Sequence, residues 1–116
     1  MTIEDIRNIC LSFKGVKEDI KWDNHLCFNI GEKMFVITSP DDVPSTASFK
    51  CTPDDFESLT ARSGITPSAY LGRYHWVYVH DINDLGKKQW EKYLRTSYEL
   101  VAGKLPKSTQ KKLGLV

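Results

Sequence analysis

The sequence predicts an α+β fold, a two-layer sandwich in which an antiparallel meander sheet has helices packed on one face. Three observations predict it: helical periodicity at both ends of the chain, alternating segments between them, and short connections that favour antiparallel neighbours. The chain has 116 residues, 41% hydrophobic and 27% charged, as in an average globular protein. We therefore expect a single domain over residues 1–116, large enough to bury a core without metals or disulfides.

The first segment has the apolar periodicity of an amphipathic helix over residues 3–13. Thr2 precedes it as the expected N-cap, and Asp5 completes an approximate capping box three positions later. Gly15 follows the last apolar position, so we expect it to end the helix in the left-handed conformation that glycine adopts readily. The apolar positions of this helix are Ile3, Ile6, Ile9, Cys10 and Phe13.

The pattern then changes to alternation, which predicts a hairpin with a two-residue turn at Gly31-Glu32. Pairing across that turn would place Phe28 opposite Phe35, so that one face of the hairpin is strongly apolar. The other face is mixed. The predicted strands cover residues 26–30 and 33–38, and a shorter extended piece at residues 17–21 precedes them.

A capping hydroxyl followed by proline marks the start of a second helix at Thr52-Pro53. A short strand over residues 47–51 precedes this helix, which is expected to end near Gly64. Residues 65–72 contain turn-forming residues and predict an irregular connection.

Residues 73–80 form the most strand-like segment, because aromatic and β-branched residues favour strands. Tyr74, Trp76 and Tyr78 share one side of this predicted strand. We expect them to pack beneath the last helix, because large aromatic side chains usually stabilise a core. That helix is predicted over residues 86–105 from a single apolar stripe.

The formal net charge of +1 conceals an uneven distribution. Residues 1–86 hold eight basic against thirteen acidic residues, a net charge of −5. Residues 87–116 hold eight against two, a net charge of +6. A basic segment beside an acidic body creates a local positive potential that attracts polyanions. A solvated C-terminal helix face explains the same lysines without a partner.

The cysteines and the N-terminus indicate a cytoplasmic protein. Cys10, Cys27 and Cys51 form an odd set without CxxC spacing, so we expect reduced thiols rather than disulfides. The first residues have neither the basic region nor the apolar stretch of a signal peptide. No apolar run approaches the roughly 20 residues of a membrane span, so we expect no membrane partner.

Residues that could form catalytic or metal-binding motifs do not have the spacing that such motifs require. His25 and Cys27 project from one face of a predicted strand, but no further ligands follow at zinc-type spacing. Asp81 begins a segment like a calcium loop, in which Leu85 occupies an oxygen-ligand position. The chain has no nucleophile elbow and no glycine-rich phosphate loop. We therefore expect no metal, no cofactor and no enzymatic activity, with a site built from scattered residues as the least favoured alternative.

Aromatic and basic side chains combine on the predicted sheet, and this combination points to nucleic acid. Flat aromatic faces stack on bases, and cations neutralise phosphates. The lysine-rich C-terminus adds further phosphate contacts. The candidate nucleic-acid-binding residues are Lys33, Lys50, Arg73, His75, Trp76, Lys104 and Lys107.

Short segments, in order along the chain, resemble the small MmcQ/YjbR-like proteins. The chain has counterparts of the family's leucine-proline-glycine segment, its glycine-lysine-methionine-phenylalanine hairpin and its leucine-lysine-cysteine-x-proline step. It also has the family's histidine-tryptophan pair and is similar in the final helix and exit. The matching segments are residues 11–19, 28–35 and 49–53, the pair His75-Trp76, and residues 97–101 and 104–107.

The resemblance implies a frataxin-like, or CyaY-like, α+β sandwich, which agrees with the element order above. For this family the fold is described as a double-wing DNA-binding arrangement. The resemblance does not imply iron chemistry, because the first helix offers only Glu4 and Asp5 in place of an acidic ridge.

We therefore predict a non-enzymatic DNA-binding domain of low sequence specificity. Its expected partner is nucleic acid, held weakly or non-specifically by basic residues of the sheet and the C-terminal helix. The alternative is a protein-interaction or small-ligand-binding module that uses the mixed second face of the sheet, with Cys27, Met34 and Val36. The sequence does not define the oligomeric state.

Overall fold

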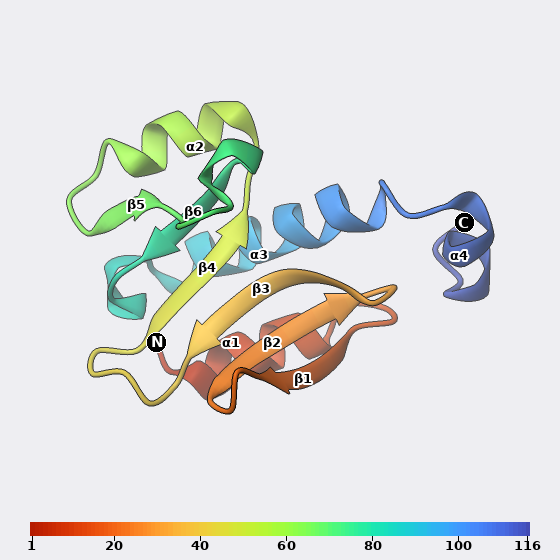
Figure 1. The fold of residues 1–116 in the computed structure, drawn as a ribbon, viewed down its shortest axis with the longest axis horizontal. Coiled ribbons are helices and arrows are strands. Elements are labelled where there is room, and N and C mark those ends of the chain that lie inside the picture. The colour runs from red at the N-terminus through yellow and green to blue at the C-terminus, as the bar shows by residue number, and fades with distance from the viewer.

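A six-stranded antiparallel sheet with helices packed on one face forms the fold (Figure 1). The structure, a computed structural model, describes residues 1–116. It confirms the predicted α+β two-layer sandwich. The helices are α1 (Ile3–Leu11), α2 (Pro53–Thr60), α3 (Lys87–Ala102) and α4 (Lys107–Lys112), with 3₁₀ turns η1 (Gly72–Tyr74) and η2 (Ile82–Asp84). The strands are β1 (Lys17–Lys21), β2 (His25–Ile30), β3 (Lys33–Ser39), β4 (Thr46–Lys50), β5 (Ile65–Pro67) and β6 (Trp76–Val79).

The first four strands form a meander in which each strand pairs with the next along the chain. β6 pairs with β4, and β5 pairs with the outer side of β6, which gives the order β1-β2-β3-β4-β6-β5. β5 lies in the segment predicted as an irregular connection. A strand of 3 residues is too short to show an alternating pattern.

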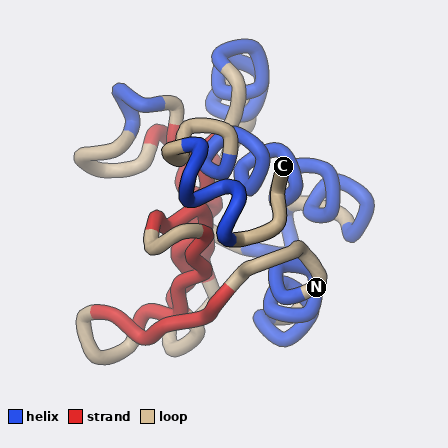
Figure 2. The backbone as a smooth tube through the Cα atoms, turned by 90° about the vertical axis from the view of Figure 1, so that its right-hand side faces the viewer, coloured by secondary structure: helices blue, strands red, loops and turns tan.

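The helices lie on one side of the sheet, which Figure 2 shows nearly edge-on. α3 packs across β3 and β4, α1 packs against α3, and α2 packs against β5 and β6. The core between the layers joins Ile6 and Trp90 of the helices to Phe28 and Phe49 of the strands, all 0% exposed. The indole N–H of Trp90 donates to the carbonyl of Ile82 at 2.8 Å, so its one polar atom is satisfied inside the core.

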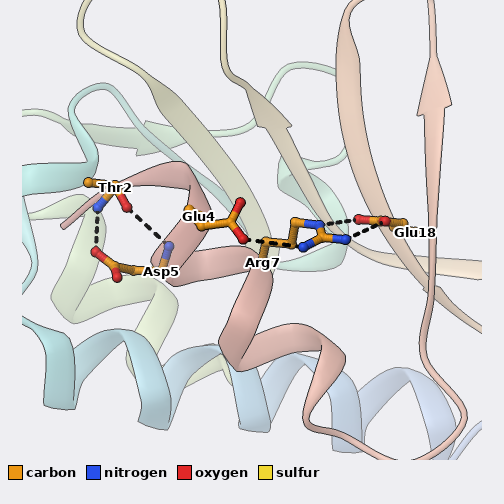
Figure 3. A network of polar contacts seen from close by, with 5 residues as sticks. All are labelled: Thr2, Glu4, Asp5, Arg7 and Glu18. Carbon is orange, nitrogen blue, oxygen red and sulfur yellow. Dashed lines mark hydrogen bonds and ion pairs between the residues drawn. The ribbon is translucent and has the colours of Figure 1, made fainter.

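The predicted helix N-caps are confirmed. Thr2 Oγ1 accepts from the Asp5 N–H at 3.1 Å, and the Asp5 carboxylate accepts from the Thr2 N–H at 2.9 Å (Figure 3). Gly15 has the expected left-handed φ of +79°, but it does not end the helix as predicted, because α1 ends at Leu11 with Ser12 as its C-cap. Thr52 caps α2 by accepting from the Asp55 N–H at 3.1 Å.

The turn between β2 and β3 has the left-handed geometry that suits a two-residue hairpin. Gly31 and Glu32 have φ of 57° and 67°. Gly31 is also approached closely, because a Cβ there would lie 2.6 Å from Leu105 Cδ1. The hairpin turn is therefore in contact with the segment that follows α3.

The register of this hairpin differs from the prediction. Phe28 lies opposite Val36 and not Phe35, because a β-bulge shifts the pairing after Phe28. The extra residue lets Phe35 and Val36 both enter the core, where each is 0% exposed. Val36 was expected on the mixed face, and that expectation is wrong. Ile37 follows the bulge and lies on the face opposite the helices.

β6 is shorter than the strand predicted over residues 73–80. The side of the strand that faces the helices is also the opposite of the one predicted. η1 and His75, which has φ of +65°, occupy the residues before it. Val77 and Val79 face the helices as part of the core. The expectation that the three aromatic residues of this segment pack beneath the last helix is therefore wrong.

Aromatic rings from other elements already fill that space. The centre of the Phe49 ring of β4 lies 5.7 Å from that of Trp90 and 5.8 Å from that of Tyr93, both on α3. Val77 lies opposite Phe49 in the neighbouring strand. A small β-branched side chain fits beside this stack, whereas a large ring would overpack the core.

One buried hydroxyl joins α3 to the sheet. Ser97 is 0% exposed, and its Oγ donates to the Phe35 carbonyl at 2.6 Å and accepts from the Lys50 N–H at 3.0 Å. These backbone groups lie at the bulge of β3 and at the last residue of β4. The hydroxyl therefore satisfies two groups at interruptions of the strand pairing.

Replacing Ser97 by Ala would leave a buried donor and a buried acceptor without a partner. Because each such group costs about 1–3 kcal/mol, we expect the free energy of unfolding to fall by about 2–6 kcal/mol. Chemical denaturation of the wild type and Ser97→Ala measures the difference. Ser58→Ala, at an exposed position of α2, is the matched control. A loss for Ser97→Ala no larger than that of the control would contradict this role.

The three cysteines are free and buried. Burial raises the pKa of Cys27 to about 11 and that of Cys51 to about 12, and it raises the pKa of Cys10 still further. Since the thiolate is the reactive form, the folded chain should protect all three thiols.

We expect a maleimide at pH 8 to modify the native protein slowly at Cys10, Cys27 and Cys51. All three should react rapidly in denaturant, where a thiol has its ordinary pKa of about 8.5. Mass spectrometry of both reactions over time checks this. Fast modification of any of the three thiols in the native state would show that its burial is transient.

Candidate nucleic-acid interface

The face of the sheet opposite α1 and α3, here called the open face, has no α-helix packed on it (Figure 2). The segment that contains η1 lies against part of it. Ser68 N–H donates to the Trp76 carbonyl at 2.9 Å, and Ser68 Oγ lies 3.0 Å from Ser48 Oγ. Ser48 in turn donates to the Val77 carbonyl at 2.7 Å. These bonds hold the segment beside β4 and β6.

A cavity of about 510 Å³ lies at the end of the sheet where β3 begins and β4 ends, beside the C-terminal end of α3, and we call it the basic groove. Three lysines line it: Lys33 at the start of β3, Lys50 at the end of β4, and Lys104 just beyond α3. Because β3 and β4 are antiparallel, the start of one and the end of the other meet at the same end of the sheet. The rest of its wall is Met34, Leu71, Tyr74, Trp76, Leu100, Val101, Leu105 and Pro106.

The positive charge of the basic groove is uncompensated. No acidic residue lines its wall. The ion pairs of the structure join Arg7 to Glu4 and Glu18, and Lys21 to Asp19. The three lysines therefore present their charges without a carboxylate partner.

The Arg7 contacts lie between α1 and β1 (Figure 3). Arg7 Nε and Nη2 donate to the two carboxylate oxygens of Glu18 at 2.7 and 2.9 Å, and Nη1 donates to Glu4 at 3.2 Å. The hydrogen bonds from Arg7 lower the pKa of Glu18. Arg7 is thus neutralised locally and adds nothing to the charge of the basic groove.

Lys50 is the most constrained cation of the basic groove. Its ammonium donates to the Tyr74 carbonyl at 2.6 Å. Partial burial lowers the pKa of Lys50 below the ordinary lysine value, and the positive charge of Lys104 lowers it further. A bound anion would supply the missing counter-charge and favour the protonated form.

The structure brings four of the seven predicted binding residues to the basic groove. Arg73 is exposed at its edge, with its guanidinium 4.9 Å from the centre of the Tyr74 ring. Because Tyr74 is part of the wall, Arg73 flanks the groove without lining it. The four residues that line it are Lys33, Lys50, Trp76 and Lys104.

The two remaining predicted residues lie outside the basic groove. The His75 ring lies edge-on to Phe56 of α2 at 5.4 Å, and the His75 carbonyl accepts from the Cys51 N–H at 2.9 Å. His75 therefore packs α2 against the sheet. Lys107 is exposed in the first turn of α4.

A second cavity of about 460 Å³ lies farther along the open face, and we call it the aromatic cavity. Trp22 and Tyr70 line it and are 64% and 96% exposed. Met34 and Leu71 line both cavities, so the two adjoin. The other residues of its wall are His25, Ile37, Ser39, Asp42, Thr46, Ser48, Ser68, Ala69 and Tyr78.

Trp22 and Tyr70 are not among the residues selected from the sequence. One signal was present, because both large rings lie among the turn-forming residues of connections between strands. Side chains in such turns rarely reach a core. Their gathering at one cavity depends on strand pairing, which the local pattern does not reveal.

The histidines and acidic residues do not gather into a cluster of potential metal ligands. His80 Nε2 lies 2.9 Å from Thr66 Oγ1, and both residues are exposed. No group of three or more potential metal-ligating side chains comes together. No helix combines the length and apolar character that a membrane crossing requires.

Removing the charge of Lys104 should raise the pKa of Lys50, because a like charge nearby disfavours protonation. Nitrogen-detected NMR titration of the lysine side chains in the wild type and in Lys104→Gln measures the change. Lys88→Gln, at the other end of α3, is the matched control. An unchanged Lys50 pKa in Lys104→Gln would contradict the proximity of the two charges.

The lowered pKa of Lys50 also determines whether the free energy of unfolding rises or falls with pH. The folded chain holds the Lys50 proton less tightly than the unfolded chain does. The contribution of Lys50 to the free energy of unfolding therefore rises with pH, from the folded-state pKa up to the ordinary value. Lys104→Gln should reduce this rise in denaturation measurements.

Comparisons with known proteins agree with this architecture. A crystal structure of the Deinococcus radiodurans protein DR2400, described as having a DUF419 domain, is 29% identical with a TM-score of 0.86. The match covers 97% of this chain and 88% of that one. A Pseudomonas syringae protein of known structure is 20% identical with a TM-score of 0.70, over 86% of this chain and 98% of that one, and shares the fold. No curated protein matches the chain.

The model of the family described as YjbR matches residues 11–100. The matched range includes Lys33, Lys50 and Trp76, and it ends before Lys104. It spans the whole sheet and most of α3. On this match, which takes in most of its length, the chain belongs to the YjbR family.

Proposed function

We propose that this chain is a non-enzymatic DNA-binding domain of low sequence specificity. The observation that carries the proposal is the convergence of Lys33, Lys50 and Lys104 on one cavity without a carboxylate partner. The three lysines come from different elements, so packing of the fold concentrates their charge. DNA presents closely spaced phosphates that such a cluster neutralises, with release of counterions.

The chemistry of the cations supports low specificity. Lysine ammonium groups bind phosphate oxygens as point charges. Contacts with phosphate do not directly distinguish one base sequence from another. Arg73 at the edge of the groove and Lys107 beyond α3 would extend the contact along a nucleic-acid backbone. In the double-wing arrangement implied by the family resemblance, the hairpin of β2 and β3 would serve as one wing, with Lys33 beside its turn.

The surroundings of the thiols support binding without catalysis. All three cysteines are buried and have raised pKa values, whereas a nucleophilic cysteine needs an accessible thiolate. Free buried thiols also agree with our proposal that the protein acts in the reducing cytoplasm.

A small amphipathic anion is the second candidate ligand. Seven of the 11 residues that line the basic groove are hydrophobic, among them Leu100, Val101 and Leu105. A cavity of this size, with apolar walls and a few charged groups, is typical of small-ligand sites. Competition between such an anion and DNA would place both ligands at the same lysines.

Anisotropy titration of a labelled duplex tests the proposal. We expect dissociation constants of about 10⁻⁴–10⁻⁶ M at physiological salt, with a log–log salt slope of about −0.9 per neutralised phosphate. Lys33→Gln and Lys104→Gln should each weaken binding for every sequence and reduce the slope by about one.

Lys88→Gln is the matched control, because it removes the same charge from an exposed position in the first turn of α3. It should leave affinity and salt slope nearly unchanged. Failure to bind at tens of micromolar protein in 50 mM salt would eliminate the proposal. Equal effects of all three substitutions would show that binding follows overall charge and not the basic groove.

A further inference from the structure

The aromatic cavity has a feature that the DNA-binding proposal does not use. Trp22 and Tyr70 expose 64% and 96% of their surface, although large aromatic side chains usually bury most of theirs. Trp22 lies in the turn between β1 and β2, and Tyr70 lies in the segment between β5 and β6. Two rings from separate parts of the chain therefore line one solvent-exposed cavity.

The backbone at both rings is unusual. Trp22 has φ of +51° and Tyr70 has φ of +64°, in the left-handed region where bulky residues are uncommon. The Trp22 ring lies edge-on to the His25 ring at 5.6 Å, which restricts its position. Exposed rings held in strained turns are typical of binding positions rather than of packing.

The two cavities adjoin along β3 and β4. The lysines lie at one end of these strands, and Ser39 and Thr46 of the aromatic cavity lie at the other end. Lys50 and Thr46 are the two ends of β4, about 13 Å apart at the usual rise of a strand. The open face therefore presents a basic site and an aromatic site side by side.

The charged groups that line the two cavities have opposite signs. The basic groove has no acidic residue, whereas the aromatic cavity has one carboxylate, Asp42, and the hydroxyls of Ser48 and Ser68. His25 Nδ1 is buried there without a hydrogen-bond partner. Phosphates are thus favoured at the lysines, and groups with N–H donors and flat faces are favoured at the aromatic end.

We propose that the open face binds single-stranded nucleic acid, with phosphates at the basic groove and unpaired bases stacked on Trp22 and Tyr70. This inference rests on the proposed nucleic-acid binding and names its substrate class. Unpaired bases can leave the strand and stack on protein rings, in sites that combine a basic groove with aromatic platforms. The bases of a duplex are stacked and paired with one another, so they do not reach such a cavity.

Anisotropy titrations with a 20-nucleotide oligothymidylate and a 20-base-pair duplex, at the same salt concentration, test this inference. We expect the single strand to bind at least tenfold more tightly. Trp22→Ala and Tyr70→Ala should each weaken single-strand binding by about 5- to 150-fold, the range for loss of one base–aromatic stack. Both substitutions should leave duplex binding within about twofold of the wild type.

Val43→Ala is the control, because Val43 is 98% exposed and belongs to neither cavity. It should change neither affinity. An abasic strand of equal length keeps the phosphates and removes the bases, so it should bind no more tightly than the duplex. Stacking should also quench tryptophan emission less in Trp22→Phe, which keeps Trp76 and Trp90, than in the wild type.

The outcomes separate this inference from the proposed function. Equal affinity for single strand, abasic strand and duplex, with loss only in Lys33→Gln and Lys104→Gln, would overturn the single-strand inference and leave DNA binding intact. Absence of binding to every oligonucleotide at low salt would overturn both. Thermal unfolding of each variant identifies any loss that follows from misfolding, because Trp22 and Tyr70 are exposed and their replacement should not destabilise the fold.

Discussion

The Ser97 hydroxyl connects the two layers of the molecule at the point where the sheet is irregular. It donates to the Phe35 carbonyl at the bulge of β3 and accepts from the Lys50 N–H at the end of β4. The same bonds position Lys50 relative to α3 and therefore relative to Lys104, which follows that helix. A contact that satisfies two buried backbone groups thus also determines the geometry of the basic groove.

The two faces of the sheet have separate roles. One face is covered by α1 and α3 and is filled by apolar rings and β-branched side chains. The open face keeps cations and aromatic rings in contact with solvent. Charge is also distributed unevenly over the molecule. Near the first helix, Glu4 and Glu18 neutralise Arg7. The lysines of the basic groove have no carboxylate partner, so they retain their charge and attract anions.

Local sequence signals were sufficient to predict most helices and strands. They failed where packing between elements determined the structure. Thr2 and Thr52 mark helix starts because a cap needs only a side chain and nearby backbone N–H groups. The bulge beside Phe28 and the orientation of Val77 follow from contacts with other elements. Four predicted site residues meet at the basic groove, whereas the ring of His75, a residue with a left-handed backbone, packs on Phe56 of α2.

The sequence by itself determined the α+β class, the helix boundaries near their caps and the candidate cations, because periodicity, capping and charge depend on residues close along the chain. Only the tertiary structure decided that Lys33, Lys50 and Lys104 share one cavity and that Trp22 and Tyr70 share the next. Such gatherings depend on strand order and register, and these are settled by which side chains fill the core together.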